Sequence, residues 1–439
     1  MPRQIRDGAG RLGMPTMVYM RPFRPSFRTA SLGALTAAVL ALPLPTPAGA
    51  APDPADDASG STQSVPLNDL GTAASRAGEP ESAPVPGTRV MPVREVRPFS
   101  LLGVVWDDPA VRLHGQVQVR TRATGSAVWS GWQNVQTDND DLPDTESAER
   151  RRSGVRGSTA PLWVGASDAV QLRIAPEASD RAPAPFPGGL RLELVDPGAA
   201  PRPGPSAELS PLGRSEARAQ AHAEMQAAGA RSTAGTPYIG PRPRIVTRAG
   251  WGADETLREP TDPTFTGPVQ AAFVHHTATG NNYTCAEAPS AIRAIYRYHV
   301  KSSGWRDIGY NFLVDKCGVI YEGRAGGVTK AVMGAHTLGF NNDTTGIAVL
   351  GTFTDDDPAK ASLEGIAALT AWKLGLSGGD PRATVRLTSA GSNLFKKGEV
   401  AQLNVISGHR DGYKSACPGD RLYDRLADTR TAAAKLQGR

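Results

Sequence analysis

The stretch Ala271-Ala272-Phe273-Val274-His275-His276-Thr277 begins with a short apolar run and reaches two adjacent histidines. Four consecutive apolar residues predict a buried strand, so the two histidines lie at its carboxyl end. Side chains alternate along a strand, and His275 and His276 therefore point to opposite faces. We expect only one of them to face a site formed with residues from elsewhere in the chain.

The residues around this stretch, from Pro241 onward, have the pattern of an α/β domain. Apolar runs at 311–314 and 319–321 predict a hairpin, and a further run at 346–351 predicts another buried strand. Helices are predicted by spacing over residues 289–300, 358–374 and 421–436. Because strands and helices alternate irregularly, we expect a mixed central β-sheet flanked by helices.

Two more residues with metal-binding side chains occur near the end of the chain. His409 lies in Ser407-Gly408-His409-Arg410-Asp411, and Cys417 follows eight residues later. With one histidine of the predicted strand they supply two imidazoles and a thiolate, a set that leaves the fourth position of a tetrahedral zinc site open for water. Ordinary polar core or loop residues are the alternative. No His-Glu-x-x-His motif is present to decide between them.

The chain has three cysteines, and their pairing bears directly on this zinc site. Cys285 and Cys317 lie in predicted loops, and an oxidising compartment would permit a disulfide between them. Cys417 would then stay single, as a metal-bound thiolate can. Pairing of Cys417 with either of the other two would abolish the zinc site, and the sequence leaves those pairings open.

A dense series of ordered motifs runs through residues 241–430. These motifs are Arg248-Ala249-Gly250-Trp251-Gly252-Ala253, Phe273-Val274-His275-His276-Thr277-Ala278, Gly304-Trp305-Arg306-Asp307-Ile308-Gly309-Tyr310-Asn311-Phe312, Tyr321-Glu322-Gly323-Arg324, Gly334-Ala335-His336-Thr337, Phe340-Asn341, Gly346-Ile347, Gly408-His409-Arg410 and Cys417-Pro418-Gly419. In them the chain resembles the zinc N-acetylmuramoyl-L-alanine amidases and the related peptidoglycan recognition proteins. The resemblance implies that a zinc-activated water hydrolyses the amide between N-acetylmuramic acid and L-alanine.

The resemblance also implies which side chains hold the metal ion. It assigns His275, His409 and Cys417 as ligands of Zn²⁺, the same set that the residue types suggest. Relatives that bind peptidoglycan without cleaving it commonly carry Ser where Cys417 stands, so a cysteine there implies an enzyme. A non-catalytic peptidoglycan-binding module and a zinc peptidase that cuts within the stem peptide are the alternatives.

Four further side chains receive roles from the resemblance. Tyr310 is expected beside the metal, where its hydroxyl can donate to the developing oxyanion. Ser415 stands where relatives carry Lys or Thr, and its hydroxyl can donate a hydrogen bond but supplies no charge. His336 and Asn341 correspond to groove residues that contact the muramyl peptide. No carboxylate is assigned as a general base.

The first fifty residues have the pattern of a secretory signal peptide. Six arginines and one acid are followed by an apolar stretch at 31–44 and by Ala48-Gly49-Ala50, a typical cleavage site. A transmembrane anchor is the alternative, but the apolar stretch is shorter than the roughly 20 residues that span a bilayer. We therefore expect a secreted protein of the extracellular space or cell wall, with no membrane association after cleavage.

The remainder of the chain is predicted to have four parts. Residues 51–88 have the composition of a disordered tether, and residues 89–198 alternate as in a small, sandwich-like antiparallel β-domain. This β-domain resembles segments that precede such amidases in secreted actinobacterial proteins. Residues 199–240 are predicted to be a linker with a short helix over 215–227, and residues 241–439 to be the zinc amidase domain.

The formal charge of +5 comes entirely from the predicted signal peptide. The rest of the chain is neutral, because 24 basic and 19 acidic side chains after residue 240 balance an acidic excess before it. The positive charge is therefore no argument for a nucleic-acid partner. The expected partner is peptidoglycan, and we expect a monomer.

Overall fold

The computed structural model describes residues 60–67, 70–72, 87–138, 141–177, 185–200, 207–227 and 238–439. They form an N-terminal β-domain and a C-terminal α/β domain. The signal peptide predicted over residues 1–50 lies outside the described residues. Within the described part of the chain, no helix combines the length and the apolar character needed to cross a bilayer.

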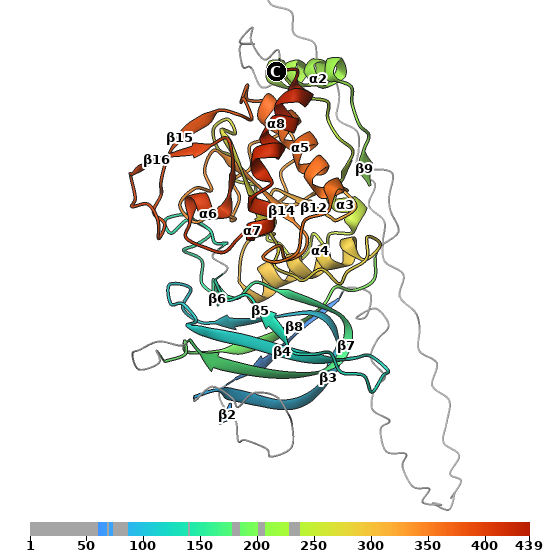
Figure 1. Cartoon of the computed structure of the whole chain (residues 1–439), viewed down its shortest axis with the longest axis vertical. Helices are drawn as coiled ribbons and strands as arrows, with labels where there is room; N and C mark the ends of the chain where they lie inside the picture. The colour runs from blue at the N-terminus through green and yellow to red at the C-terminus, as the bar shows by residue number, and fades with distance from the viewer. Residues whose placement is uncertain are drawn as a thin grey trace, which may run out of the picture. The chain divides into compact units, whose positions relative to one another are not determined.

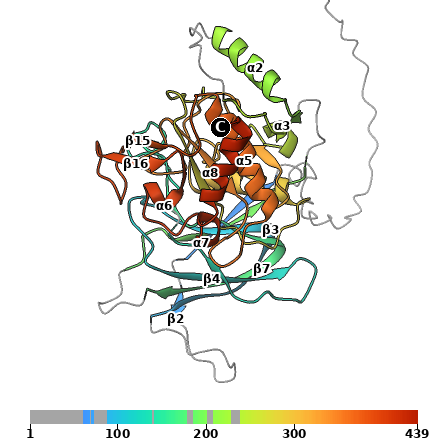
Figure 2. The same ribbon diagram turned by 45° about the horizontal axis from the view of Figure 1, so that its top comes forward.

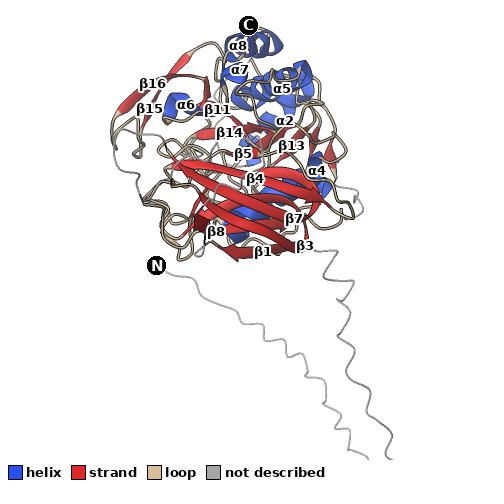
Figure 3. Cartoon of the chain, turned by 60° about the horizontal axis from the view of Figure 1, so that its bottom comes forward, coloured by secondary structure: helices blue, strands red, loops and turns tan. Residues whose placement is uncertain are grey.

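The N-terminal β-domain is an antiparallel sheet with the strand order β1-β8-β3-β7-β4-β5 (Figure 3). Its alternating pattern buries Val117, Val119, Leu172 and Ile174 on one face, which confirms the predicted antiparallel β-domain. The short strands β2 and β6 pair with β3 beside this path. The strands are β1 Ser61–Pro66, β2 Gly71–Thr72, β3 Arg89–Trp106, β4 Gly115–Ala123, β5 Gln133–Val135, β6 Gly157–Ser158, β7 Leu162–Pro176 and β8 Arg191–Asp196.

The predicted tether and linker both contain ordered elements that the sequence pattern did not reveal. Strand β1, inside the predicted disordered tether 51–88, pairs antiparallel with β8. In the predicted linker 199–240, β9 (Glu208–Leu209) pairs with β10, and α2 (Arg214–Ala227) buries Ala217 against the C-terminal domain. The helix was predicted, but its place in the C-terminal domain was not. Both predictions were wrong in part because edge strands of two to six mostly polar residues give little hydrophobic signal.

The C-terminal domain has a mixed sheet, as predicted, and the sheet contains seven strands. Its order is β17-β11-β14-β12-β13-β10-β9, in which β17, β11, β14 and β12 run parallel and β13 turns back antiparallel to β12. A separate hairpin, β15–β16, was not predicted. The strands are β10 Ile245–Val246, β11 Ala271–His276, β12 Phe312–Val314, β13 Ile320–Glu322, β14 Thr344–Val349, β15 Thr384–Thr388, β16 Val400–Asn404 and β17 Ile406–Gly408.

Helices cover both faces of this sheet, so its central strands β11 and β14 are buried along their whole length. On one face α5 (Lys360–Gly375) and α8 (Leu426–Gln437) lie side by side and pack on residues such as Val274 and Ile347 (Figures 1 and 2). On the other face, α4 (Ala288–Arg297) packs on neighbours such as Ala348 and continues as a π-helical turn at Tyr298–Ser302. The short helices are α3 Arg248–Trp251, α6 His409–Gly412 and α7 Asp420–Tyr423.

The two domains share a large hydrophobic cluster. Leu101, Trp163 and Val195 of the β-domain pack with residues of α4 and the turn that follows it. The Tyr298 hydroxyl donates to the carbonyl oxygen of Thr159 at 3.2 Å. Gly103 makes room for this ring, because a Cβ there would lie 2.3 Å from the Tyr298 hydroxyl oxygen. The β-domain is therefore packed against the α/β domain through close apolar contacts.

Lys373 of α5 should make stability depend on pH. Its ammonium is buried and donates to the carbonyl oxygens of Val328 and Lys330 at 2.8 and 2.7 Å, and burial lowers its pKa to about 7. An unfolded lysine has a pKa of about 10.4, so between these values the unfolded chain binds more protons than the folded one. Stability should therefore rise with pH, by at most about 1.4 kcal/mol per unit.

Denaturant unfolding of the full chain between pH 7 and pH 9.5 measures this slope. Lys373→Met should remove it, while the exposed Lys360→Met should leave it unchanged. Equal slopes for wild type and Lys373→Met would contradict the assignment.

Candidate active site

Two of the three predicted ligands meet because β11 and β17 are parallel neighbours. Val274 is in register with Gly408, so the next residues, His275 and His409, lie side by side at the carboxyl ends of their strands. Their ring centroids are 4.6 Å apart. Carboxyl ends of parallel strands meet at one edge of a sheet, which is where α/β folds commonly place a site.

Cys417 reaches the same point from the loop that precedes α7. Its Sγ atom lies 3.8 Å from Nδ1 of His275, and the ligand atoms of the three residues all lie within 4.8 Å of one another. All three side chains are fully buried. The ring of His276 points away and accepts a hydrogen bond from the Phe353 amide at 3.3 Å. The structure thus brings together the three residues that the sequence selected, with one histidine of the pair.

The protonation states of these side chains suit a cation. Burial lowers the pKa of both His275 and His409 to about 3, which keeps the imidazoles neutral, the form that binds metal. Burial raises the pKa of the Cys417 thiol well above its usual value, so a thiolate there needs a cation beside it. Within the described residues, neither ring nitrogen of His409 makes a hydrogen bond. Two imidazoles and a thiol, buried and converging, fit Zn²⁺.

The Nε2 atom of His275 has polar contacts of its own, with Thr337 and, through it, His336. This atom lies 3.3 Å from the Thr337 hydroxyl, which in turn lies 3.0 Å from Nδ1 of His336. Such partners fix the tautomer and the ring orientation of a ligand histidine. His336, predicted to contact the muramyl peptide, is fully buried next to Thr337. Thr337 was not singled out by the sequence.

Tyr310 lies at the site as expected, and it meets a residue from the β-domain that sequence reasoning missed. Its ring centroid is 5.6 Å from that of His275. Its hydroxyl donates to Oδ2 of Asp141 at 2.6 Å. Burial and the Asp141 charge raise the pKa of Tyr310 well above its usual value, so the hydroxyl keeps its proton and can donate.

The two remaining predicted residues, Asn341 and Ser415, hydrogen-bond to residues next to this site. The Asn341 side chain accepts hydrogen bonds from the His336 and Thr337 amides and donates to the β-domain at the carbonyl oxygen of Leu142. The Ser415 hydroxyl accepts a hydrogen bond from the Cys417 amide at 2.9 Å, which stabilises the loop that carries Cys417. Its catalytic role stays a prediction.

Two family models match the chain, one in each of its two domains. Residues 265–420 match the family model described as N-acetylmuramoyl-L-alanine amidase, and residues 50–202 match the model described as Rv3811 N-terminal galactose-binding domain-like. Peptidoglycan recognition protein 1 of Bos indicus is 30% identical over 180 residues, which cover 41% of this chain and 80% of that protein. The chain belongs to the N-acetylmuramoyl-L-alanine amidase and peptidoglycan recognition protein family.

Other relatives differ in length and in name. The N-acetylmuramoyl-L-alanine amidase of Homo sapiens is 33% identical over 189 residues, which cover 42% of this chain and 28% of that protein. The crystal structure of human PGRP-IBETAC in complex with glycosamyl muramyl pentapeptide is 29% identical with a TM-score of 0.33, and the match covers 42% of this chain and 94% of that one. Enzymes and recognition proteins thus both occur among the relatives, so the choice between them depends on the site.

The amidase domain has one disulfide, between Cys285 and Cys317, as predicted. It joins the loop before α4 to the turn of the β12–β13 hairpin. Cys417 stays unbridged and buried. The two alternative pairings of Cys417 are thereby excluded, and its thiol is available to a metal ion.

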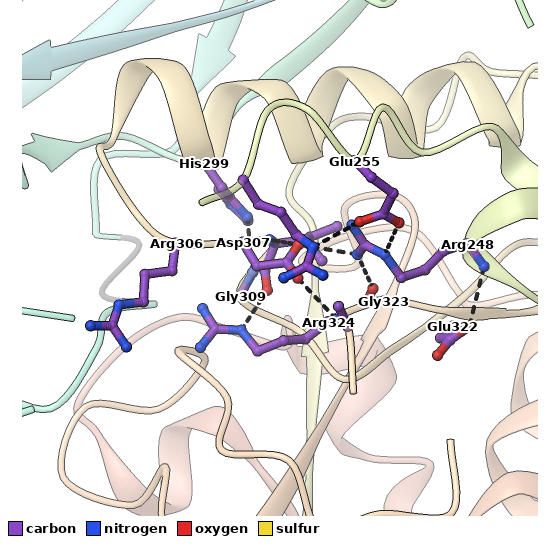
Figure 4. Close-up of polar contacts among 12 residues, drawn as sticks. Arg248, Glu255, His299, Arg306, Asp307, Gly309, Glu322, Gly323 and Arg324 are labelled. Atoms are coloured by element: carbon purple, nitrogen blue, oxygen red, sulfur yellow. Dashed lines mark hydrogen bonds and ion pairs between the residues drawn. The ribbon is translucent and has the colours of Figure 1, made fainter. Parts of the chain in front are cut away.

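The amidase domain also contains a network of buried arginines (Figure 4). Arg248 donates to Glu255 at 2.7 Å and to Asp307 at 3.0 Å, and Figure 4 shows Arg324 next to these groups. Neighbouring side chains, including Arg306 and Arg324, line a cavity of about 200 Å³. Its wall also contains Pro143, Asp144 and residues 147–149 of the β-domain, so both domains line this cavity.

Proposed function

We propose that the protein is a secreted, zinc-dependent amidase that cleaves the bond between N-acetylmuramic acid and L-alanine in peptidoglycan. The observation that carries the proposal is the buried set of His275, His409 and Cys417 with the Tyr310 hydroxyl beside it. Cysteine at position 417 favours an enzyme over a non-catalytic binding module, because it completes a three-ligand set of the catalytic kind.

The residues of the site would have different roles in hydrolysis. His275, His409 and Cys417 would hold Zn²⁺, which when bound supplies an activated water and polarises the scissile carbonyl. Thr337 keeps Nδ1 of His275 turned toward the ligand set by contacting Nε2. Tyr310 would donate a hydrogen bond to the negative charge that develops on the carbonyl oxygen, from a buried position where such donors act strongly.

The groove residues would orient the muramyl peptide. The Asn341 amide nitrogen donates to the carbonyl oxygen of Leu142 and to Asp144, and it would offer these hydrogen bonds to the muramyl peptide instead. His336 supports this face from below through the Asn341 side chain, which accepts from its amide at 2.7 Å. Ser415, in the loop that carries Cys417, would donate a hydrogen bond to the substrate. Peptidoglycan is the proposed partner, and the predicted signal peptide and the disulfide favour export.

Digestion of purified peptidoglycan, followed by mass spectrometry of the released ends, tests this proposal. Stem peptides that begin with a free L-alanine amine are the expected products. Cleavage between amino acids of the stem would instead favour a peptidase. Intact binding to peptidoglycan without any product would favour the recognition module.

Removal of the metal should stop the reaction reversibly. Dialysis against a chelator is expected to reduce the hydrolysis rate to background, because no other described group replaces the polarising charge. Stoichiometric Zn²⁺ should restore the rate, whereas Mg²⁺ should not, since two imidazoles and a thiolate are poor ligands for it. Activity that survives metal removal would contradict the proposal.

A further inference from the structure

The chain between β5 and β6 is anchored at both ends in the sheet of the β-domain. It leaves the sheet after Val135 and returns at Gly157. Residues 138–149, called here the 138–149 segment, contain six acidic side chains and no basic one, and the structure describes residue 138 and residues 141–149 of them. The amidase domain has a basic excess, so the two parts attract each other electrostatically.

Asp141 is the point at which the 138–149 segment meets the candidate metal ligands. Its side chain is fully buried, and Oδ1 lies 3.0 Å from Nδ1 of His275 and 3.4 Å from Nδ1 of His409. Its other oxygen, Oδ2, accepts the hydrogen bond from Tyr310. A carboxylate oxygen is a regular zinc ligand, and one more ligand completes a tetrahedral set.

The residues that follow Asp141 contact the groove. The carbonyl oxygen of Leu142 and Oδ1 of Asp144 both accept from the Asn341 amide nitrogen, at 2.9 and 2.8 Å. Asp144 also accepts from the Gly339 amide at 2.6 Å. The Leu142 side chain packs against Trp305. Carbonyl, carboxylate and apolar groups in succession are also what a muramyl peptide presents, so the segment uses the contacts that the substrate would need.

Further contacts hold the ends of the segment. Asp138 accepts from the Ala416 amide at 2.9 Å, next to the ligand Cys417. Glu149 accepts two hydrogen bonds from Arg324, both of 2.8 Å, and both side chains are buried. Burial alone would raise the pKa of Glu149, but the Arg324 charge holds it below its usual value. This paired, charge-assisted contact is of the strong kind.

We propose that the 138–149 segment is an internal inhibitor of the amidase site and that Asp141 is the fourth protein ligand of its metal ion. The proposal rests on the proposed function, since it names a ligand of the same centre. A site closed by four protein ligands has the character of a structural metal site, with no position left for water. Muramyl peptide must therefore displace the segment before it is cleaved.

Attachment to the same chain makes the segment an effective competitor. A tethered group acts at an effective concentration of about millimolar, independent of protein dilution. Only the fraction of molecules in which the segment has left the groove is active, so a closed-to-open ratio of about 100 would lower activity about 100-fold.

Asp141→Ala in the full chain should lower the retention of Zn²⁺ and raise the rate of hydrolysis. Release of Zn²⁺ to a chelator should become about tenfold faster or more, because a ligand is lost. Hydrolysis of peptidoglycan should become about tenfold faster or more, because the groove opens. A loss of folding would lower both metal retention and activity, so the opposite signs are diagnostic. The exposed Glu177→Ala of the β-domain is the matched control and should change neither.

Two further measurements keep the outcomes separate. The visible spectrum of the Co²⁺-loaded protein should differ between wild type and Asp141→Ala, and identical spectra would overturn the ligand assignment. Glu149→Gln weakens the charge-assisted contact by which Arg324 binds the 138–149 segment, and it changes no metal ligand. This variant should also increase the rate of hydrolysis. Slower hydrolysis in both variants would overturn the inhibitory role.

Failure of the proposed function is distinguishable from failure of this inference. If no variant cleaves peptidoglycan, calorimetric binding of a muramyl tripeptide to the metal-free chain still reports on the groove. Tighter binding by Asp141→Ala and Glu149→Gln than by wild type would support displacement of the segment. Equal binding in all three would overturn it.

Discussion

Replacement of Cys417 by serine is expected to abolish hydrolysis of peptidoglycan while the chain still folds. The Cys417 side chain is fully buried against His275 and has no disulfide partner, so its loss affects the ligand set rather than a bridge. A metal ion contributes several kcal/mol of transition-state stabilisation. Each 1.36 kcal/mol corresponds to a tenfold change in rate, and the expected loss is therefore roughly 1,000-fold or more.

The other two cysteines provide the matched control for this substitution. A double variant, Cys285→Ser with Cys317→Ser, removes the disulfide and should lower the free energy of unfolding by about 2–4 kcal/mol. It should nevertheless keep stoichiometric zinc and its hydrolytic rate under conditions in which it is folded. Metal analysis and rate measurements on both variants check this. Full activity of Cys417→Ser would show that the thiolate is not a ligand that the reaction needs.

Replacement of Tyr310 by phenylalanine is expected to lower kcat by about 100-fold to 1,000-fold, the usual effect of removing one oxyanion donor. The hydroxyl is positioned for this role, because it donates at 2.6 Å to Asp141, whose other carboxylate oxygen lies 3.0 Å from Nδ1 of His275. The phenyl ring keeps the packing against His275, so zinc content should not change. KM should change little, since the donor acts on charge that develops in the transition state.

Tyr321→Phe separates this effect from the general loss of a buried hydroxyl. The Tyr321 hydroxyl donates to Asp315 at 2.8 Å, outside the groove. Its removal should cost stability, by about 1–3 kcal/mol for the acceptor left behind, but not kcat. Comparable kcat values for Tyr310→Phe and wild type would remove Tyr310 from the proposed mechanism.

The ligand set was predictable because its signals are local. The apolar run before His275 predicts a buried strand, and the residue types of His409 and Cys417 suggest a metal. The parallel register of β11 and β17 explains why these residues meet. The short edge strands β1 and β9 were missed, because they are mostly polar and are held by backbone pairing to a neighbour.

Asp141 was not predictable in the same way. Its role depends on how one domain packs on another, and no periodicity in residues 136–156 records that. The one available signal was the concentration of acidic side chains over residues 138–149, ahead of a basic domain. No carboxylate was assigned from the sequence, whereas the structure places Asp141 of the β-domain beside His275.

The cluster shared by the two domains has a practical consequence for truncation. A chain shortened to residues 241–439 would expose the apolar side of α4 that Leu101, Trp163 and Val195 now cover. It would also leave the Tyr298 ring without the surface around Gly103. Such a fragment would tend to aggregate. The proposed inhibition is therefore best tested with point substitutions in the intact chain. Aggregation of the isolated C-terminal domain would say nothing about its chemistry.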